Sequence, residues 1–278
     1  MSTVSPVFEA VDNRLVQRGS GYLAQAIRYR AFFAYWIRRS LAVRYRQTSF
    51  GWAWAVFEPL WSSLIYIVVF SFIVRVNTGP VPYPLFIILN VVLWNYFNRI
   101  VARSTTSITS NVDLLSKVQF PREFLPLGIC AESATDLAIG LVITGSVFAY
   151  YHFLPPAIAP LAVFALLVET VLALGIAFYL AALTAIVRDL LIVIPLVLQL
   201  LFFLSPVIYP ITSVPVFVNR FYFLNPLTAI FASYQETLLY GQFGHWKELL
   251  GTGAFAVVLL ISGYQVFKRL EWQFADLL

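Results

Sequence analysis

The sequence predicts an all-α integral membrane protein with six transmembrane helices. Of its 278 residues, 60% are apolar and only 11% are charged, and the mean hydropathy is +0.83. A soluble domain carries about 25% charged residues, so a water-soluble globule of this composition would expose apolar patches that associate. A disordered chain has few apolar and many charged residues, so this composition also excludes a disordered protein. One cysteine, Cys130, excludes an intramolecular disulfide framework.

Six segments are apolar enough to cross a bilayer, which takes about 20 residues of helix. They are residues 52–74, 84–101, 125–151, 157–187, 190–209 and 249–267. We assign them to a transmembrane domain at residues 51–278, which follows a cytoplasmic segment at residues 1–50. That segment carries eight arginines and no long apolar core, so we do not expect it to be a cleavable signal.

The basic residues predict the orientation in the membrane. With six crossings, 15 of the 18 lysines and arginines fall on one side, and only Arg75, Arg220 and Lys247 fall on the other. Loops rich in lysine and arginine stay in the cytoplasm. We therefore expect both termini to be cytoplasmic.

Residues 22–50 alternate apolar side chains with arginines at roughly helical spacing. This pattern is typical of an amphipathic helix lying in the membrane interface. Arg44 and Arg46 could bind an anionic lipid or a diphosphate headgroup, because the guanidinium group matches phosphate oxygens. The alternative is that the segment only anchors the chain by its positive charge.

The second connection, residues 102–124, is the longest polar stretch between crossings. Leu114, Leu115 and Val118 predict a short amphipathic helix that Pro121 ends. Such a helix could dock a soluble partner, or the stretch could be a simple connecting loop.

Residues 210–248 are too apolar for an ordinary outer loop. Pro210, Pro215 and Pro226 divide them into segments 215–224 and 226–240, each too short to span a bilayer. We expect short re-entrant or outer helices here, since non-helical backbone at membrane depth must be covered by protein or line a water-filled cavity.

Four acidic side chains lie in or beside the crossings: Glu58, Glu132, Asp136 and Glu169. A charge at mid-membrane costs about 2.5–3.5 kcal/mol on insertion scales, so each should face protein or water. Glu132 and Asp136 are four residues apart, hence on one helix face. We expect them to pair with arginines at the cytoplasmic rim; a proton relay or a metal pair is the functional alternative.

The fourth segment carries small residues at four-residue spacing, which lets helices approach closely. We interpret them as a packing face formed by Ala173, Ala177, Ala181 and Ala185.

Several chemistries lack support in the sequence. There is no Gly-x-x-x-x-Gly-Lys-Ser/Thr phosphate loop, and His152 and His245 belong to no metal-binding motif. We therefore expect no catalytic residue, no metal and no cofactor in this chain.

Several strings resemble the type-2 ABC exporter permeases, in family order and at matching spacing. Residues 44–60 read Arg-Tyr-Arg-Gln-Thr-Ser-Phe-Gly-Trp-Ala-Trp-Ala-Val-Phe-Glu-Pro-Leu, like the start of that family's first crossing. Residues 120–127, Phe-Pro-Arg-Glu-Phe-Leu-Pro-Leu, are similar to its Phe-Pro-Arg-Glu-Ile-Leu-Pro-Leu. Further matches are Arg188-Asp189, residues 205–209, residues 225–227 and residues 271–276. Residues 1–27 lie outside the resemblance, and Phe50 replaces the usual leucine.

The branch that the chain resembles most exports O-antigen, capsule or teichoic acid polysaccharides. The resemblance implies a homodimeric permease of the bacterial cytoplasmic (inner) membrane with two separate ATP-binding cassette subunits, which carry the ATP and Mg²⁺. It implies a lipid-linked glycan as substrate, usually on a polyprenyl diphosphate, with membrane lipids around it and no nucleic acid partner. The family's coupling element falls on residues 107–120, here with Asp113, Leu114, Leu115, Lys117 and Val118, and its outer gate helices fall on about residues 215–240.

The resemblance also suggests a use for the aromatic residues, which make up 17% of the chain. Sugar C–H faces stack on aromatic rings, so we expect an aromatic substrate path. Its candidates are Trp54, Phe57, Trp61, Tyr66, Phe202, Phe203, Tyr209, Phe217, Phe221 and Tyr222. Two alternatives remain: a permease of the same fold that exports a drug or lipid, and an integral-membrane transferase that uses Glu132 and Asp136.

Overall fold

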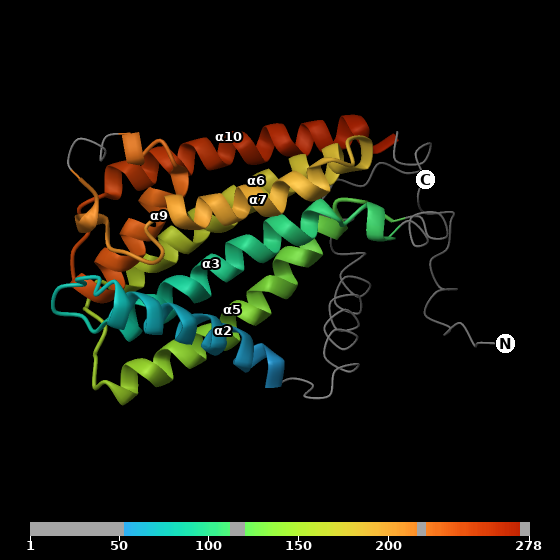
Figure 1. Cartoon of the computed structure of the whole chain (residues 1–278). Helices are drawn as coiled ribbons and strands as arrows, with labels where there is room; N and C mark the ends of the chain where they lie inside the picture. The colour runs from blue at the N-terminus through green and yellow to red at the C-terminus, as the bar shows by residue number, and fades with distance from the viewer. Residues whose placement is uncertain (1–52, 112–119, 216–220, 273–278) are drawn as a thin grey trace.

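The computed structural model describes residues 53–111, 120–215 and 221–272, and every regular element in these ranges is helical (Figure 1). Four helices are long and apolar enough to cross a membrane. The all-α prediction is confirmed for the described residues, whereas six crossings and their orientation remain predictions. The α-helices are α2 (Ala53–Tyr66), α3 (Tyr83–Thr105), α5 (Phe124–Tyr150), α6 (Ala162–Ile186), α7 (Leu190–Leu204), α9 (Pro226–Gln235) and α10 (Trp246–Leu270).

The four long helices agree with the predicted second, third, fourth and sixth crossings. The closest agreement is α5, predicted at residues 125–151. Helix α3 continues four residues beyond its predicted end at Val101, and α10 extends three residues beyond its predicted limits at each end. The fourth predicted segment, residues 157–187, contains α6 and the short helix η4 (Ala159–Leu161) that precedes it.

The first and fifth predicted segments form shorter helices. Helix α2 passes into a π-helix, η2 (Ile67–Ile73), so together they cover most of residues 52–74. The predicted fifth crossing, residues 190–209, was wrong at its end, because α7 stops at Leu204. Ser205 is extended there, with φ −105° and ψ 152°. Proline disfavours helical backbone in the residue before it, so Pro206 accounts for the early end.

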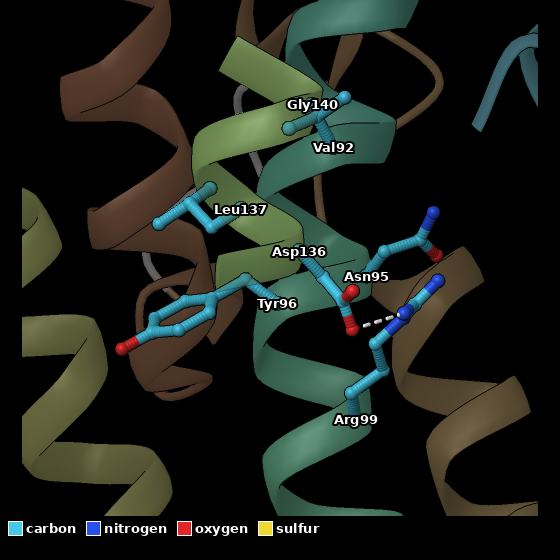
Figure 2. Close-up of a pocket in the computed structure, with 7 residues that line it drawn as sticks. All are labelled: Val92, Asn95, Tyr96, Arg99, Asp136, Leu137 and Gly140. Carbon is cyan, nitrogen blue, oxygen red and sulfur yellow. Dashed lines mark hydrogen bonds and ion pairs between the residues drawn. The ribbon is translucent and has the colours of Figure 1, made fainter. Parts of the chain in front are cut away.

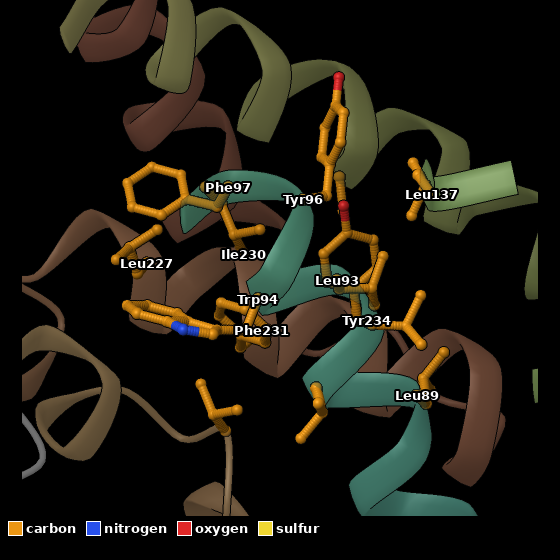
Figure 3. Packing of buried hydrophobic residues seen from close by; sticks show 14 of the residues in the cluster. Leu89, Leu93, Trp94, Tyr96, Phe97, Leu137, Leu227, Ile230, Phe231 and Tyr234 are labelled. Carbon is orange, nitrogen blue, oxygen red and sulfur yellow. The ribbon is translucent and has the colours of Figure 1, made fainter. Parts of the chain in front are cut away.

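Helix α3 lies at the centre of the bundle. Its side chains from Leu85 to Trp94 are all buried, and it packs against α2, α5, α6, α7 and α9. Figure 3 shows α9 placing Phe231 beside Trp94, where the ring centroids are 6.4 Å apart. The apolar core is therefore built around a helix that has little contact with the surroundings of the protein.

Helices α6 and α10 make the most extensive helix contact of the bundle, running side by side in Figure 1. At their crossing, a Cβ atom on Gly263 would lie 2.7 Å from the carbonyl oxygen of Gly175. The two backbones can come this close because neither Gly175 nor Gly263 carries a Cβ atom. The predicted packing face of α6 is confirmed for Ala173, Ala177 and Ala181, which are fully buried, whereas Ala185 near the end of the helix is only partly buried.

Helix α9 and the π-helix η6 (Glu236–Tyr240) occupy residues 226–240, the predicted second short segment. The Asn225 side chain accepts a hydrogen bond from Leu227 N at 3.0 Å, and Pro226 occupies the first turn. Both features favour a helix start at this point. Every residue of α9 from Leu227 to Gln235 is buried, so a helix too short to span is covered by protein, as expected for a re-entrant element.

Several predicted features lie outside the described residues. These are the interface helix at residues 22–50 with Arg44 and Arg46, the coupling residues Asp113, Leu114, Leu115, Lys117 and Val118, and Phe217 in the first outer segment. They remain predictions.

Candidate functional site

A cavity of about 400 Å³ lies between α2, α3 and α7. It combines aromatic rings with side-chain amides, although the three helices are otherwise strongly apolar. The residues that line it are Ser62, Tyr66, Val91, Trp94, Asn95, Asn98, Ala102, Pro195, Leu198, Gln199, Phe202 and Phe203. We call it the α2–α3–α7 groove.

One wall of the groove is aromatic and centres on Phe202. The centroid of its ring lies 5.2 Å from that of Tyr66, 5.3 Å from that of Trp94 and 5.3 Å from that of Phe203. These rings come from three helices, and the separations are typical of favourable aromatic pairs. Phe202 is buried while Phe203 is about half exposed, so the cluster has a packed side and an accessible side.

The other wall is polar, and the sequence predictions missed it. Asn95, Asn98 and Ala102 are three and four residues apart, which places them on one face of α3, and Gln199 faces the same groove from α7. Amides are expensive inside a membrane unless they face protein or water. The signal was present in the sequence as amides spaced along an apolar segment.

The structure separates the predicted aromatic residues of the first crossing. Tyr66 lines the groove, whereas Trp54, Phe57 and Trp61 are not among its lining residues and are 47%, 55% and 64% exposed. Ser62 lines the groove four residues before Tyr66, so the face of α2 that meets the groove does not include Trp61. The predicted stripe on α2 therefore divides into one groove residue and three outward-facing rings.

Further along, Tyr209 and Tyr222 meet beyond the end of α7. Their hydroxyl oxygens lie 2.7 Å apart, and Tyr209 also donates to the carbonyl oxygen of Phe203 at 2.8 Å. Phe221 is 69% exposed beside them. The two tyrosines thus connect the segment that precedes α9 with the groove residue Phe203.

A ladder of ion pairs joins α3 to α5. Arg99 Nη1 lies 2.5 Å from Asp136 Oδ2, and Arg103 Nη2 lies 2.6 Å from Glu132 Oε2. From the first pair to the second, the residue number rises by four on α3 and falls by four on α5, as expected for antiparallel helices. Arg99 also binds Glu58 of α2 at 2.6 Å. The predicted pairing of the two α5 acids with arginines is confirmed.

A small cavity of about 20 Å³ adjoins this ladder (Figure 2). Its lining includes Asn95, Tyr96, Arg99 and Asp136, and also Gly140, where an added Cβ would lie 2.5 Å from Val92. This volume suits about one water molecule, which needs two to four polar partners. Asn95 lines both cavities, so the polar wall of the groove continues into the ion-pair ladder.

Within the ranges that the structure describes, Glu169 pairs with no arginine. It is fully buried on α6 and accepts a hydrogen bond from the Tyr234 hydroxyl at 2.6 Å. Nearby, the hydroxyl groups of Tyr96 and Thr170 lie 2.9 Å apart. Within the described residues, no group of three or more His, Cys, Asp or Glu side chains could hold a metal ion.

Between α9 and α10, Glu236 holds a turn together. It accepts hydrogen bonds from the backbone nitrogens of Gly244 and His245 at 2.8 and 3.1 Å, and from His245 Nδ1. Burial raises the pKa of Glu236, but the bonds from His245 and Gly244 outweigh it and leave that pKa below its ordinary value. The hydrogen bond to Glu236 raises the pKa of His245 against the opposing effect of burial.

The long apolar helices and the partly polar groove between them are features of a multi-pass membrane protein. The chain belongs to the ABC-2 type transporter family, which matches residues 31–239. The family consists of permeases, so the resemblance deduced from the sequence strings is confirmed.

Curated relatives cover nearly the whole chain. An O-antigen export system permease protein, RfbA, of Myxococcus xanthus is 26% identical over 89% of this chain and 95% of its own length. The RfbA protein of Klebsiella pneumoniae is 27% identical over 86% and 92%. The polysialic acid transport protein KpsM of Escherichia coli is 22% identical over 91% and 96%.

Proposed function

We propose that this chain is the channel-forming permease subunit of an ATP-driven exporter of a lipid-linked polysaccharide. The substrate would be an O-antigen-type glycan on a polyprenyl diphosphate, moved from the cytoplasm to the outer side of a bacterial cytoplasmic membrane. The α2–α3–α7 groove carries this proposal, because it places aromatic rings opposite amides. The names of the relatives, which are export proteins for O-antigen and polysialic acid, support the substrate class.

The groove suits a sugar chain chemically. Rings such as Tyr66 and Phe203 can stack on C–H faces of sugars, while Asn98 and Gln199 can exchange hydrogen bonds with hydroxyl groups. A conduit must also release what it binds, which favours many weak contacts over a few tight ones. Repeated stacking and exchangeable amide bonds meet that requirement.

The proposed complex contains two copies of this chain and two ATP-binding cassette subunits. ATP and Mg²⁺ would reside on those subunits, which would dock on the 102–124 connection. Arg44 and Arg46 are proposed to bind the diphosphate headgroup at the cytoplasmic surface. Both termini are proposed to be cytoplasmic.

Two other functions are less well supported. A drug or lipid exporter would favour an aliphatic cavity, and the amides of Asn95, Asn98 and Gln199 argue against one. A transferase that uses Glu132 and Asp136 as metal ligands is disfavoured because Arg103 and Arg99 already neutralise these carboxylates.

Deletion of the gene in its native strain tests the function. The proposed exporter predicts that glycan disappears from the cell surface and accumulates inside on its lipid carrier, and that the intact gene restores export. Chromatography of extracted lipid-linked glycan and surface labelling with a lectin measure the two pools. Unchanged surface glycan combined with altered resistance to a drug would instead favour a drug exporter.

A further inference from the structure

The two limbs of the 102–124 connection rest on the same helices. In the first limb, the carbonyl oxygen of Thr105 accepts a hydrogen bond from Thr184 Oγ1 of α6 at 2.6 Å, and Ile108 is completely buried. In the second limb, Phe120 packs against the cluster that contains Ile108. Residues between these limbs, 112–119, are not described by the structure.

This cluster links the limbs to α6 and α10. Phe178 of α6 and Phe267 of α10 lie at its centre with ring centroids 5.5 Å apart, and Leu125 at the start of α5 is buried beside them. Both limbs of the connection are therefore held by one apolar contact that α6 and α10 share.

Charged groups tie the second limb to the end of α10. Lys268 Nζ donates to Glu123 Oε2 at 2.6 Å and to Glu271 Oε2 at 2.9 Å. Arg122 donates to the backbone carbonyl oxygen of Glu271. A helix leaves its last carbonyl groups without partners inside the helix, so this contact also completes the end of α10. We call Lys268, Glu123 and Glu271 the α10 clamp.

The helices behind the clamp cannot easily slide. At the α6–α10 crossing, backbone meets backbone through Gly175 and Gly263, and packed interiors of this kind transmit displacement rather than absorb it. A movement of the second limb would therefore reach the α6–α10 pair through the clamp.

We propose that Lys268 is a positioning residue that couples the 102–124 connection to α10. This inference rests on the proposed function, in which an ATP-binding cassette subunit docks on that connection. The clamp turns a displacement of the connection into a displacement of α6 and α10. It acts on coupling, so ATP hydrolysis by the partner subunit does not require it.

The test uses the complete complex with its ATPase subunit, in membranes and after reconstitution. In Lys268→Met the long apolar stem remains but the charge is lost. We expect the ATPase to co-purify and hydrolyse ATP, while exported glycan per ATP falls by about fivefold or more, the lower end of typical coupling between sites. Lys247→Met, at the opposite end of α10 and exposed, is the matched control and should keep the ratio.

A charge exchange gives a readout that simple destabilisation would not reproduce. With Glu271→Gln as the common background, Lys268→Glu alone or Glu123→Lys alone should uncouple export, and the two together should restore it. Lys268→Arg keeps the positive charge at this position and should therefore keep coupling.

The outcomes separate the inference from the function on which it rests. An assembled Lys268→Met complex with unchanged glycan exported per ATP would overturn the inference and leave the proposed function intact. An assembled charge-exchange complex that stays uncoupled would overturn it as well. If the unsubstituted chain neither binds the ATPase subunit nor exports glycan, the proposed function itself is wrong.

Discussion

Removing one charge of the Arg103–Glu132 pair should destabilise the bundle, whereas removing both should not. The Glu132 side chain is 1% exposed and that of Arg103 is 35% exposed. In Glu132→Leu the guanidinium group remains without its partner, and its Nη1 atom already lacks a hydrogen bond among the described residues. Breaking a buried ion pair costs about 3–5 kcal/mol. Because Arg103 is partly exposed, we expect the lower end, about 3 kcal/mol.

The double variant Arg103→Met/Glu132→Leu removes both charges and keeps similar volumes. Replacement of a buried pair by apolar residues is often neutral or stabilising, so its free energy of unfolding should lie within about 1 kcal/mol of the unsubstituted chain. Steric trapping in bicelles can measure this free energy for the two single variants and the double variant.

One result would refute this reasoning, and a second would contradict a purely structural role of the pair. A loss of less than about 1 kcal/mol in Glu132→Leu would mean that the pair contributes little to folding. A double variant that folds normally but exports nothing would show that the charges act in transport, which is the functional alternative for the two acids.

Three further predictions concern other sites. Gly263→Ala should lower the free energy of unfolding by about 1–3 kcal/mol, because its Cβ would lie 2.7 Å from the Gly175 carbonyl oxygen. The control Gly251→Ala should leave this free energy unchanged, because a Cβ there would have no atom within 4 Å. Equal effects of the two substitutions would contradict the packing argument. Protection from hydrogen exchange at residues 236–245, relative to the intrinsic exchange rate at each pH, should be highest between about pH 4.5 and 6.5, since the contribution of Glu236 is lost as pH falls through its lowered pKa and that of His245 as pH rises through its raised pKa. His245→Gln should remove the alkaline loss of protection, and a persisting loss would exclude the pair as its cause. Tyr66→Ala should reduce surface glycan more than Trp61→Ala does, because only Tyr66 lines the groove; the opposite order at equal expression would place the path elsewhere.

The sequence was sufficient for features that depend on local signals. Composition and segment length located α5 and α10 to within three residues at each end, and Pro226 marked the start of α9. The pairing of Glu132 and Asp136 with arginines followed from the cost of a buried charge alone. Each of these depends on residues close together in the chain or on a physical penalty that any fold must meet.

Features that depend on which helices are neighbours were not accessible from the sequence. The polar wall of the groove requires Gln199 of α7 to lie beside Asn95 and Asn98 of α3, and no local pattern states that adjacency. The structure divides the aromatic stripe on α2 for a related reason. Helical spacing placed Trp61 and Tyr66 in one broad stripe, but only contact with α7 decides which part of that stripe faces the groove.

The burial of α9 has a consequence for how the protein is made. With ten residues, α9 is too short to be held in a bilayer as an independent span. Its last residue, Gln235, donates to the carbonyl oxygen of Pro206, a group on the segment that precedes it, and α9 packs against α3, α6 and α10. During synthesis Pro206, α3 and α6 leave the ribosome before α9 does, whereas α10 leaves after it. The surroundings of α9 are therefore complete only once α10 has been made, and biogenesis has a late step in which a short segment packs into protein rather than into lipid.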